Sequence, residues 1–258
     1  MKRYLIYICT VLCTATGLRA QAFADSAIVY TKAMADSAYA AADYATAIHI
    51  YEHLLDTEGE SVVVYYNLAN GYYKQGEIAH AILNYERALL MEPSNSDIQF
   101  NLELARSKAV DKNAIVTELF FVRWIRGFKT ILSADGWAKT AILCFIILIL
   151  CLTIFIFAKN KKTKKFIFIF ALLSAVSTIV ANIIAADQKE KMVLRENAII
   201  MEPSVTIRST PSVNGTELFI LHEGKKVKVK DDSMKDWKEI EIEDGNIGWL
   251  PASTIERI

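Results

Sequence analysis

Cysteine is scarce in this chain of 258 residues, and its charges leave no net excess of either sign. The four cysteines all lie in apolar stretches, at Cys9, Cys13, Cys144 and Cys151, which excludes a disulfide framework and a paired-cysteine metal site. The 29 basic residues balance 29 acidic ones, so the chain as a whole has no basic footprint for nucleic acid. The apolar fraction of 53% excludes an intrinsically disordered chain.

The balanced total conceals segments of opposite charge. Residues 25–113 carry a net charge of −7, whereas residues 114–186 carry +7. Segments that differ this much in charge are expected to lie in different surroundings. The sequence therefore indicates several parts rather than one uniform domain.

The N-terminus has the pattern of a secretory signal. Met1, Lys2 and Arg3 are followed by an apolar run that ends near Leu18. A basic start before a short apolar run predicts a signal peptide over residues 1–20. The cleavage sites that fit are after Ala20 and after Ala24. An uncleaved N-terminal anchor is the alternative, but this run is short for a span of roughly 20 residues.

Two later apolar runs are long enough to cross a membrane. Residues 137–158 contain a single charge, Lys139, and residues 166–186 contain none. A helix needs roughly 20 residues to cross about 30 Å of hydrocarbon. So small a chain has no room to bury both runs in a soluble core, so we predict two transmembrane helices.

Charged residues around these runs predict the topology. Residues 159–165 contain five lysines, which predicts a cytoplasmic turn between the two spans. After a translocated signal, both flanking regions then lie outside, in the periplasm of a bacterium with two membranes. Residues 119–132 are amphipathic with an aromatic edge, which predicts a helix in the membrane interface. An ordinary docking helix packed on the preceding domain is the alternative.

The exported segment before the spans has an internal repeat. Residues 62–95 place small and aromatic residues at helix-packing intervals, with Gly76 between two helices and Pro93 after the second. Ala47 and Ala81 lie 34 residues apart within the same local pattern. This segment resembles the tetratricopeptide repeat, TPR. The predicted array, residues 25–113, consists of repeats at 28–61 and 62–95 and a capping helix at 96–110.

Resemblance to the TPR family implies a concave groove that binds peptides or partner helices. The positions that would line it are Lys32, Asp36, Tyr39, Tyr66, Asn67, Asn70 and Tyr73. Lys32 and Asn67 match a polar clamp that holds C-terminal carboxylates in some TPR domains, but Asp36 replaces an asparagine of that clamp. This replacement and the negative charge nearby argue against an acidic peptide tail. Packing between helices is the alternative role for the tyrosines.

One motif resembles a metal site. His49, Glu52 and His53 match the H-x-x-E-H pattern of inverted zinc proteases. They fall on the second helix of the first repeat without an obvious third ligand, so we interpret the histidines as solvated surface groups. The sequence also lacks a nucleophile elbow and a phosphate-binding loop. We therefore predict a protein that is not an enzyme and uses no cofactor or metal.

Residues 193–258 change to short β-prone segments separated by turn residues. The expected strands are 198–201, 205–208, 225–230, 237–243 and 247–250. Residues 207–212 and 248–256 resemble the first and last motifs of the bacterial SH3-like family. This resemblance implies a small barrel that binds cell-wall peptide or protein, with Trp237, Trp249 and Pro251 as its aromatic surface. Burial of one or both tryptophans in the core is the alternative.

The order of these parts resembles the BatE type of the aerotolerance-related Bat family. The fold expected is multidomain, with all-α TPR helical repeats, two transmembrane helices and a small all-β SH3-like barrel. Family membership implies an inner-membrane adaptor for an aerotolerance or envelope-stress complex. Its partners would be membrane proteins with von Willebrand A domains and, indirectly, a MoxR-type ATPase. A peptidoglycan-binding envelope anchor that uses the SH3-like domain is the alternative function.

Overall fold

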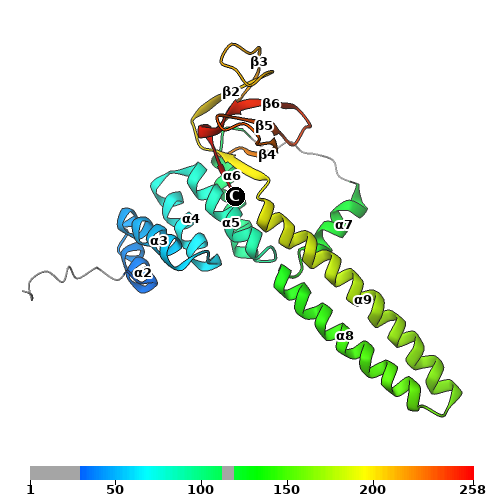
Figure 1. The fold of residues 1–258 in the computed structure, drawn as a ribbon. Helices are drawn as coiled ribbons and strands as arrows, with labels where there is room; N and C mark the ends of the chain where they lie inside the picture. The colour runs from blue at the N-terminus through cyan, green and yellow to red at the C-terminus, as the bar shows by residue number, and fades with distance from the viewer. Residues whose placement is uncertain (1–29, 112–118) are drawn as a thin grey trace, which may run out of the picture.

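A computed structural model describes residues 30–111 and 119–258 of the chain (Figure 1). A block of paired helices leads through a short amphipathic helix into two long antiparallel helices, and a small β-sheet follows. The helical block and the sheet lie together at one end of the long helices (Figure 1). The predicted signal peptide and its two cleavage sites fall outside the described residues.

The helical block is built from helical hairpins. Its helices are α2 (Lys32–Ala40), α3 (Tyr44–Glu58), α4 (Val62–Gln75), α5 (Ile78–Met91) and α6 (Ser96–Lys108). The side chains of Thr31, Asp43 and Asn95 accept hydrogen bonds from backbone N–H groups in the first turns of α2, α3 and α6. Helix α4 ends at Gly76, whose φ of 88° lies in the left-handed region that glycine adopts without strain.

Small residues at equivalent repeat positions let these helices approach closely. Ala47 in α3 and Ala81 in α5 are both fully buried, 34 residues apart. A Cβ atom on Gly71 of α4 would lie 3.0 Å from the Ile48 side chain in α3, so a larger residue would push these helices apart. The 34-residue period of the sequence is therefore also a packing period, as expected of stacked repeats.

Helices α8 (Ala134–Phe157) and α9 (Lys161–Leu194) are long and apolar enough to cross a membrane. In the most apolar stretch of each helix, only 11% of α8 and 22% of α9 is buried inside the protein. Most of their apolar surface therefore faces outward. They pack against each other through small residues such as Ala141 and Ala181, and Ser174 Oγ donates a 2.6 Å hydrogen bond to the Cys144 carbonyl. Close packing through small residues is typical of membrane helix pairs.

The helices differ in extent from the apolar runs of the sequence. Helix α9 begins at Lys161, where Asn160 caps it, so most of the lysine-rich segment 159–165 is helical rather than part of the turn. At its other end α9 continues past residue 186 to Leu194 and stops at Arg195, whose backbone is left-handed. Helices do not end where hydrophobicity ends, because Asp187 to Lys191 include good helix formers.

The C-terminal region is an antiparallel sheet with strand order β3-β2-β6-β5-β4-β1-β7. Its strands are β1 (Asn197–Ile200), β2 (Ser204–Arg208), β3 (Glu217–His222), β4 (Lys226–Asp231), β5 (Trp237–Glu241), β6 (Ile247–Pro251) and β7 (Ile255–Arg257). The sequence pattern missed β3, whose Leu218 and Ile220 are about half exposed, and the three-residue β7. The predicted fold class is confirmed: helical repeats, two candidate membrane helices and a small all-β domain of SH3-like type.

Strand β1 joins the sheet to the helical block. Ala198 and Ile200 point into the core of the sheet, where they pack with Ile207 and Ile240. Ile199, between them, points the other way and belongs to the core formed by the repeat helices. A strand whose two faces are both buried is apolar without alternation, which explains the run of three apolar residues here. The sheet is therefore docked on the repeats rather than tethered to them.

Candidate functional site

Asp36 organises the polar groove of the repeats. Its carboxylate accepts hydrogen bonds from Lys32 Nζ at 2.6 Å, Tyr51 Oη at 2.6 Å and Asn67 Nδ2 at 3.2 Å. Partial burial raises the pKa of Asp36, but these three donors outweigh it and hold the pKa below its ordinary value. Asp36 is therefore an ionised acceptor that joins α2, α3 and α4.

A cavity of about 210 Å³ opens at this point. It is lined by Asp36, Tyr39, Tyr51, Asn67 and Asn70. Four of the predicted groove residues thus meet around one space, and Lys32 reaches it through its ion pair with Asp36. Polar side chains from both helices of the first hairpin and from α4 therefore line one cavity.

Tyr51 was absent from the predicted groove because it lies on the second helix of its repeat. The same hydrogen bond recurs one repeat later, where Tyr85 Oη donates to Asn70 Oδ1 at 2.5 Å. Tyr51 and Tyr85 are 34 residues apart, as are Asp36 and Asn70. Tyr51 could therefore have been identified from the sequence by the 34-residue period, which relates Tyr51 to Tyr85 and Asp36 to Asn70.

The remaining predicted groove residues, Tyr66 and Tyr73, are half-buried beside α6. Tyr66 Oη accepts a 2.7 Å hydrogen bond from Asn101 Nδ2, and Lys108 Nζ lies 4.3 Å from the centre of the Tyr73 ring. Both rings also pack on the core of the repeats. They are not among the residues lining the Asp36 cavity, so the structure does not bring all the predicted groove residues together at one cavity.

The predicted aromatic surface of the sheet lies on one face of two neighbouring strands. Trp237 in β5 is paired with Pro251 in β6, and Glu239 is paired with Trp249. Paired residues of antiparallel strands share a face, so both tryptophans and Pro251 are on the same side. All three are partly exposed, between the fully buried Ile240 and Leu250 of the core and open solvent.

The H-x-x-E-H residues are occupied with packing contacts. The rings of His49 and His53 lie 5.7 Å and 4.9 Å from the ring of Tyr30, edge to face, and Glu52 accepts a hydrogen bond from Tyr72 Oη. Across residues 30–111 and 119–258, no cluster of three or more potential metal-ligating side chains is present. This stretch therefore provides an aromatic cluster at the start of the repeats.

The repeats and the sheet are joined by ion pairs. Glu86 of α5, only 5% exposed, pairs with Arg106 of α6 and accepts a 2.7 Å hydrogen bond from Lys226 of β4. Arg87 Nη2 lies 2.9 Å from Glu256 of β7. His222 of β3 donates its backbone N–H to Asp111 at 2.6 Å. These contacts fix the relative position of the two regions.

Helix α7 (Phe120–Lys129) presents an unusual surface beside the long helices. None of its residues is buried, and Phe120 and Trp124 are 84% and 72% exposed. Its C-terminal end is fixed: Trp137 Nε1 donates to the Lys129 carbonyl at 2.9 Å, and Lys129 Nζ lies 3.0 Å from Asp187 of α9. An exposed aromatic face is thus held level with one end of the helix pair.

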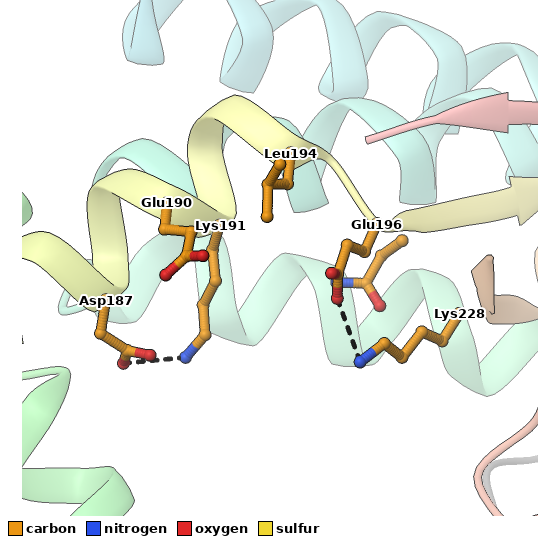
Figure 2. A pocket seen from close by; sticks show the side chains of 7 residues that line it. Asp187, Glu190, Lys191, Leu194, Glu196 and Lys228 are labelled. Atoms are coloured by element: carbon orange, nitrogen blue, oxygen red, sulfur yellow. Dashed lines mark hydrogen bonds and ion pairs between the residues drawn. The ribbon is translucent and has the colours of Figure 1, made fainter. Parts of the chain in front are cut away.

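A second cavity, of about 280 Å³, lies where α9 meets the sheet (Figure 2). Four of its five charged residues form pairs: Asp187 with Lys191 at 3.1 Å, and Glu196 with Lys228 at 3.0 Å. Figure 2 shows these pairs lying along the cavity wall, with Leu194 between them. These ion pairs lie where the C-terminal end of α9 meets the sheet, and they connect the two elements.

The stacked hairpins and the cavity between them define a helical-repeat interaction module. Residues 62–95 match the family model of the tetratricopeptide repeat. They comprise α4, α5 and the residues that directly follow α5. A comparison with curated proteins gives no match. TPR repeats are protein–protein interaction modules and are typically not catalytic, so protein binding is the activity that this region supports.

Proposed function

We propose that this protein is a non-enzymatic adaptor of the bacterial inner membrane that presents a TPR groove and an SH3-like domain in the periplasm. The observation that carries the proposal is that the helical block and the sheet dock on each other at one end of the antiparallel pair α8 and α9 (Figure 1). Two antiparallel spans return a chain to the side on which it started. Both binding modules would therefore share one compartment and one anchor.

The proposed orientation rests on charge. The lysines of residues 159–165 cluster at the far end of the helix pair, away from both modules, and such a cluster favours the cytoplasmic side. The signal-like N-terminus favours export of the first module. Helix α7, with its exposed aromatic residues and with Arg123 and Lys129, would lie in the outer interface of the membrane.

The partner in the TPR groove is proposed to be a protein segment without an acidic tail. It would contact Lys32, Asp36, Tyr39, Asn67 and Asn70 at the cavity and the rings of Tyr66 and Tyr73 beyond it. Asp36 would repel a carboxylate, whereas the tyrosines offer broad apolar contact with polar edges. On the resemblance to the BatE type, the complex would serve aerotolerance or envelope stress. It would include membrane proteins with von Willebrand A domains and, indirectly, a MoxR-type ATPase.

The second candidate function is an envelope anchor that binds peptidoglycan. It is favoured by the shared face of Trp237, Trp249 and Pro251, because partly exposed aromatic rings on a sheet suit stacking on sugar or peptide. This function would require the SH3-like domain alone to hold the wall. The adaptor function requires the groove.

One pair of variants separates the two functions. We expect the solubilised full-length protein to co-purify with envelope membrane proteins, and the Tyr66→Ala/Tyr73→Ala variant to recover about tenfold less of them. Tyr66→Phe/Tyr73→Phe is the matched control, since it keeps both rings and should retain most of the recovery. Circular dichroism must show all three proteins equally helical.

The wall function is tested on the same full-length protein. Sedimentation with purified sacculi that is lost in Trp237→Ala/Trp249→Ala, together with unchanged partner recovery in the tyrosine variants, would contradict the adaptor proposal. The full chain is used throughout because Ile199 and Ile258 of the sheet region pack into the core of the repeats.

A further inference from the structure

A third cavity lies between the repeats and the sheet, apart from the groove. Its volume is about 480 Å³, and the residues that define its chemistry are Glu52, Tyr72, Asn84, Arg87, Arg195 and Glu256. They come from α3, α4 and α5, from the link between α9 and β1, and from β7. It shares no lining residue with the Asp36 cavity, so the partner proposed for the groove does not explain it.

Asn84 contributes an unused acceptor to this cavity. Its side chain is only 3% exposed, and its Nδ2 donates a 2.9 Å hydrogen bond to the His80 carbonyl. A backbone carbonyl only accepts, so the amide nitrogen must face it and the oxygen must face away. Asn84 Oδ1 has no hydrogen-bond partner within the described residues. A buried acceptor without a donor is destabilising, so this position suits a donor from outside the chain, either a water molecule or a ligand.

The charges around the cavity leave an excess of acceptors. Four carboxylates and two guanidinium groups line it: Glu52, Asp56, Glu60, Glu256, Arg87 and Arg195. Both arginines are in ion pairs, Arg87 with Glu256 at 2.9 Å and Arg195 with Glu60, although Arg87 Nε, like His80 Nδ1, has no hydrogen-bond partner of its own among the described residues. The carboxylates of Glu52 and Asp56 have no basic partner among the residues that the structure describes. The cavity is therefore suited to a cation.

One wall of the cavity is aromatic. The rings of Tyr72 and His80 stack with their centres 4.8 Å apart, and Tyr72 Oη donates to Glu52. Burial, and then the neighbouring Glu52, raise the pKa of Tyr72, so its hydroxyl remains a donor that orients the carboxylate. Asn84 lies one helical turn after His80, so the aromatic stack, the carboxylate and the free amide oxygen belong to one continuous surface.

We propose that this cavity binds a primary alkylammonium group. An ammonium has three donors and no acceptor, which matches the free Asn84 Oδ1 and the oriented Glu52 carboxylate. Its alkyl stem would pack along the stacked rings of Tyr72 and His80. A metal ion is a poorer match, because residues 30–111 and 119–258 offer no group of three metal ligands. Since Arg195 and Glu256 complete the walls, the bound cation also strengthens the docking of the sheet on the repeats.

Two sources supply this chemistry, a small free amine and the lysine side chain of a partner. The probes are butylammonium chloride and a blocked tripeptide with a central lysine, and 1-butanol is the uncharged control. Binding to solubilised full-length protein is measured by calorimetry and by the rise in melting temperature. We expect the ammonium compound to bind and raise the melting temperature and 1-butanol to do neither. Binding of the tripeptide but not of butylammonium assigns the site to a partner lysine.

Variants test the two groups that receive the cation. Glu52→Gln removes the charge at an exposed position, and Asn84→Leu removes the free acceptor at similar volume; each should weaken binding about tenfold. Glu103→Gln is the matched control, because the same change on the exposed face of α6 should leave binding unchanged. Without ligand, Asn84→Leu should melt no lower than the wild type, since it removes an unsatisfied group. Absence of binding by both cations, or undiminished binding in Glu52→Gln, would overturn the proposal.

Discussion

Lys226 in β4 donates a 2.7 Å hydrogen bond to the carboxylate of Glu86 in α5, across 140 residues of sequence. Glu86 is 5% exposed, and Arg106 of α6 contacts its other oxygen. A carboxylate this deeply buried is tolerated only because two cations neutralise it. One residue of the repeats thus joins α5, α6 and the sheet, which holds the repeats and the sheet together.

The first prediction concerns the stability of this joint. Glu86→Gln leaves two partly buried cations without their counter-charge and should lower the free energy of unfolding by about 3 kcal/mol. Glu103→Gln is the matched control, because Glu103 pairs with the same Arg106 but its side chain is 71% exposed. The control should change stability by less than about 0.5 kcal/mol. Denaturant titration of the full-length protein measures both, and equal effects would refute a special role for Glu86.

The second prediction concerns acid. Burial raises the pKa of Glu86, but Lys226 and Arg106 outweigh it and hold the pKa below its ordinary value of 4.5. A depressed pKa contributes stability that is present above pH 4.5 and is lost as the pH falls through the lower, folded-state value. The difference in melting temperature between wild type and Glu86→Gln should therefore be constant well above pH 4.5 and should shrink as the pH falls below 4.5. A difference that stays constant below pH 4.5 as well would show that Glu86 does not titrate as described.

The third prediction concerns topology. In a variant lacking the native cysteines, single cysteines at Ser61 and Ser233 should react with a membrane-impermeant thiol reagent in intact spheroplasts. A cysteine at Asn160, in the turn between α8 and α9, should react only after the membrane is opened. The reverse pattern would invert the orientation. Labelling of only one of the two outer positions would contradict the docking of sheet and repeats on one side.

The fourth prediction concerns α7. With Trp137, Trp237 and Trp249 replaced by phenylalanine, Trp124 is the remaining tryptophan, and it is 72% exposed. If α7 lies in the interface, lipids brominated near the headgroup should quench its fluorescence more strongly than lipids brominated near the chain ends. Emission that no brominated lipid quenches would mean that α7 docks on protein instead. A Phe120→Glu change in the same background should reduce the quenching, since it introduces a charge into the apolar face.

The elements of this fold that depend on local interactions along the chain were the ones predicted from the sequence. Apolar runs near residues 137–158 and 166–186 are local, and they give α8 and α9, although the helices extend beyond them. The repeat helices also depend on local signals, because their capping residues and Gly76 lie at the helix ends that they determine. Strand β3 was missed because its exposed Leu218 and Ile220 break the expected alternation.

The candidate site also contains residues that were predicted from the sequence and residues that were not. Asp36, Tyr39, Asn67 and Asn70 were predicted from the resemblance to the TPR family, and they meet at one cavity. Tyr51 and the third cavity were not predicted, because their roles depend on partners in other helices and in the sheet. The orphaned oxygen of Asn84 in particular has no sequence signal, since an asparagine on a helix is ordinary until its neighbours are known.

The sequence by itself determined the parts: helical repeats, two long apolar helices and a small β domain, because periodicity, caps and hydrophobic runs act over one or two turns of chain. Only the tertiary structure decided how the parts combine. Ile199 packs into the repeats while its neighbours Ala198 and Ile200 pack into the sheet, and Glu86 finds Lys226. The contacts of Ile199 and of Glu86 join the sheet to repeat helices that are distant in the sequence, so their energy depends on the folded arrangement and leaves no periodic pattern in the chain.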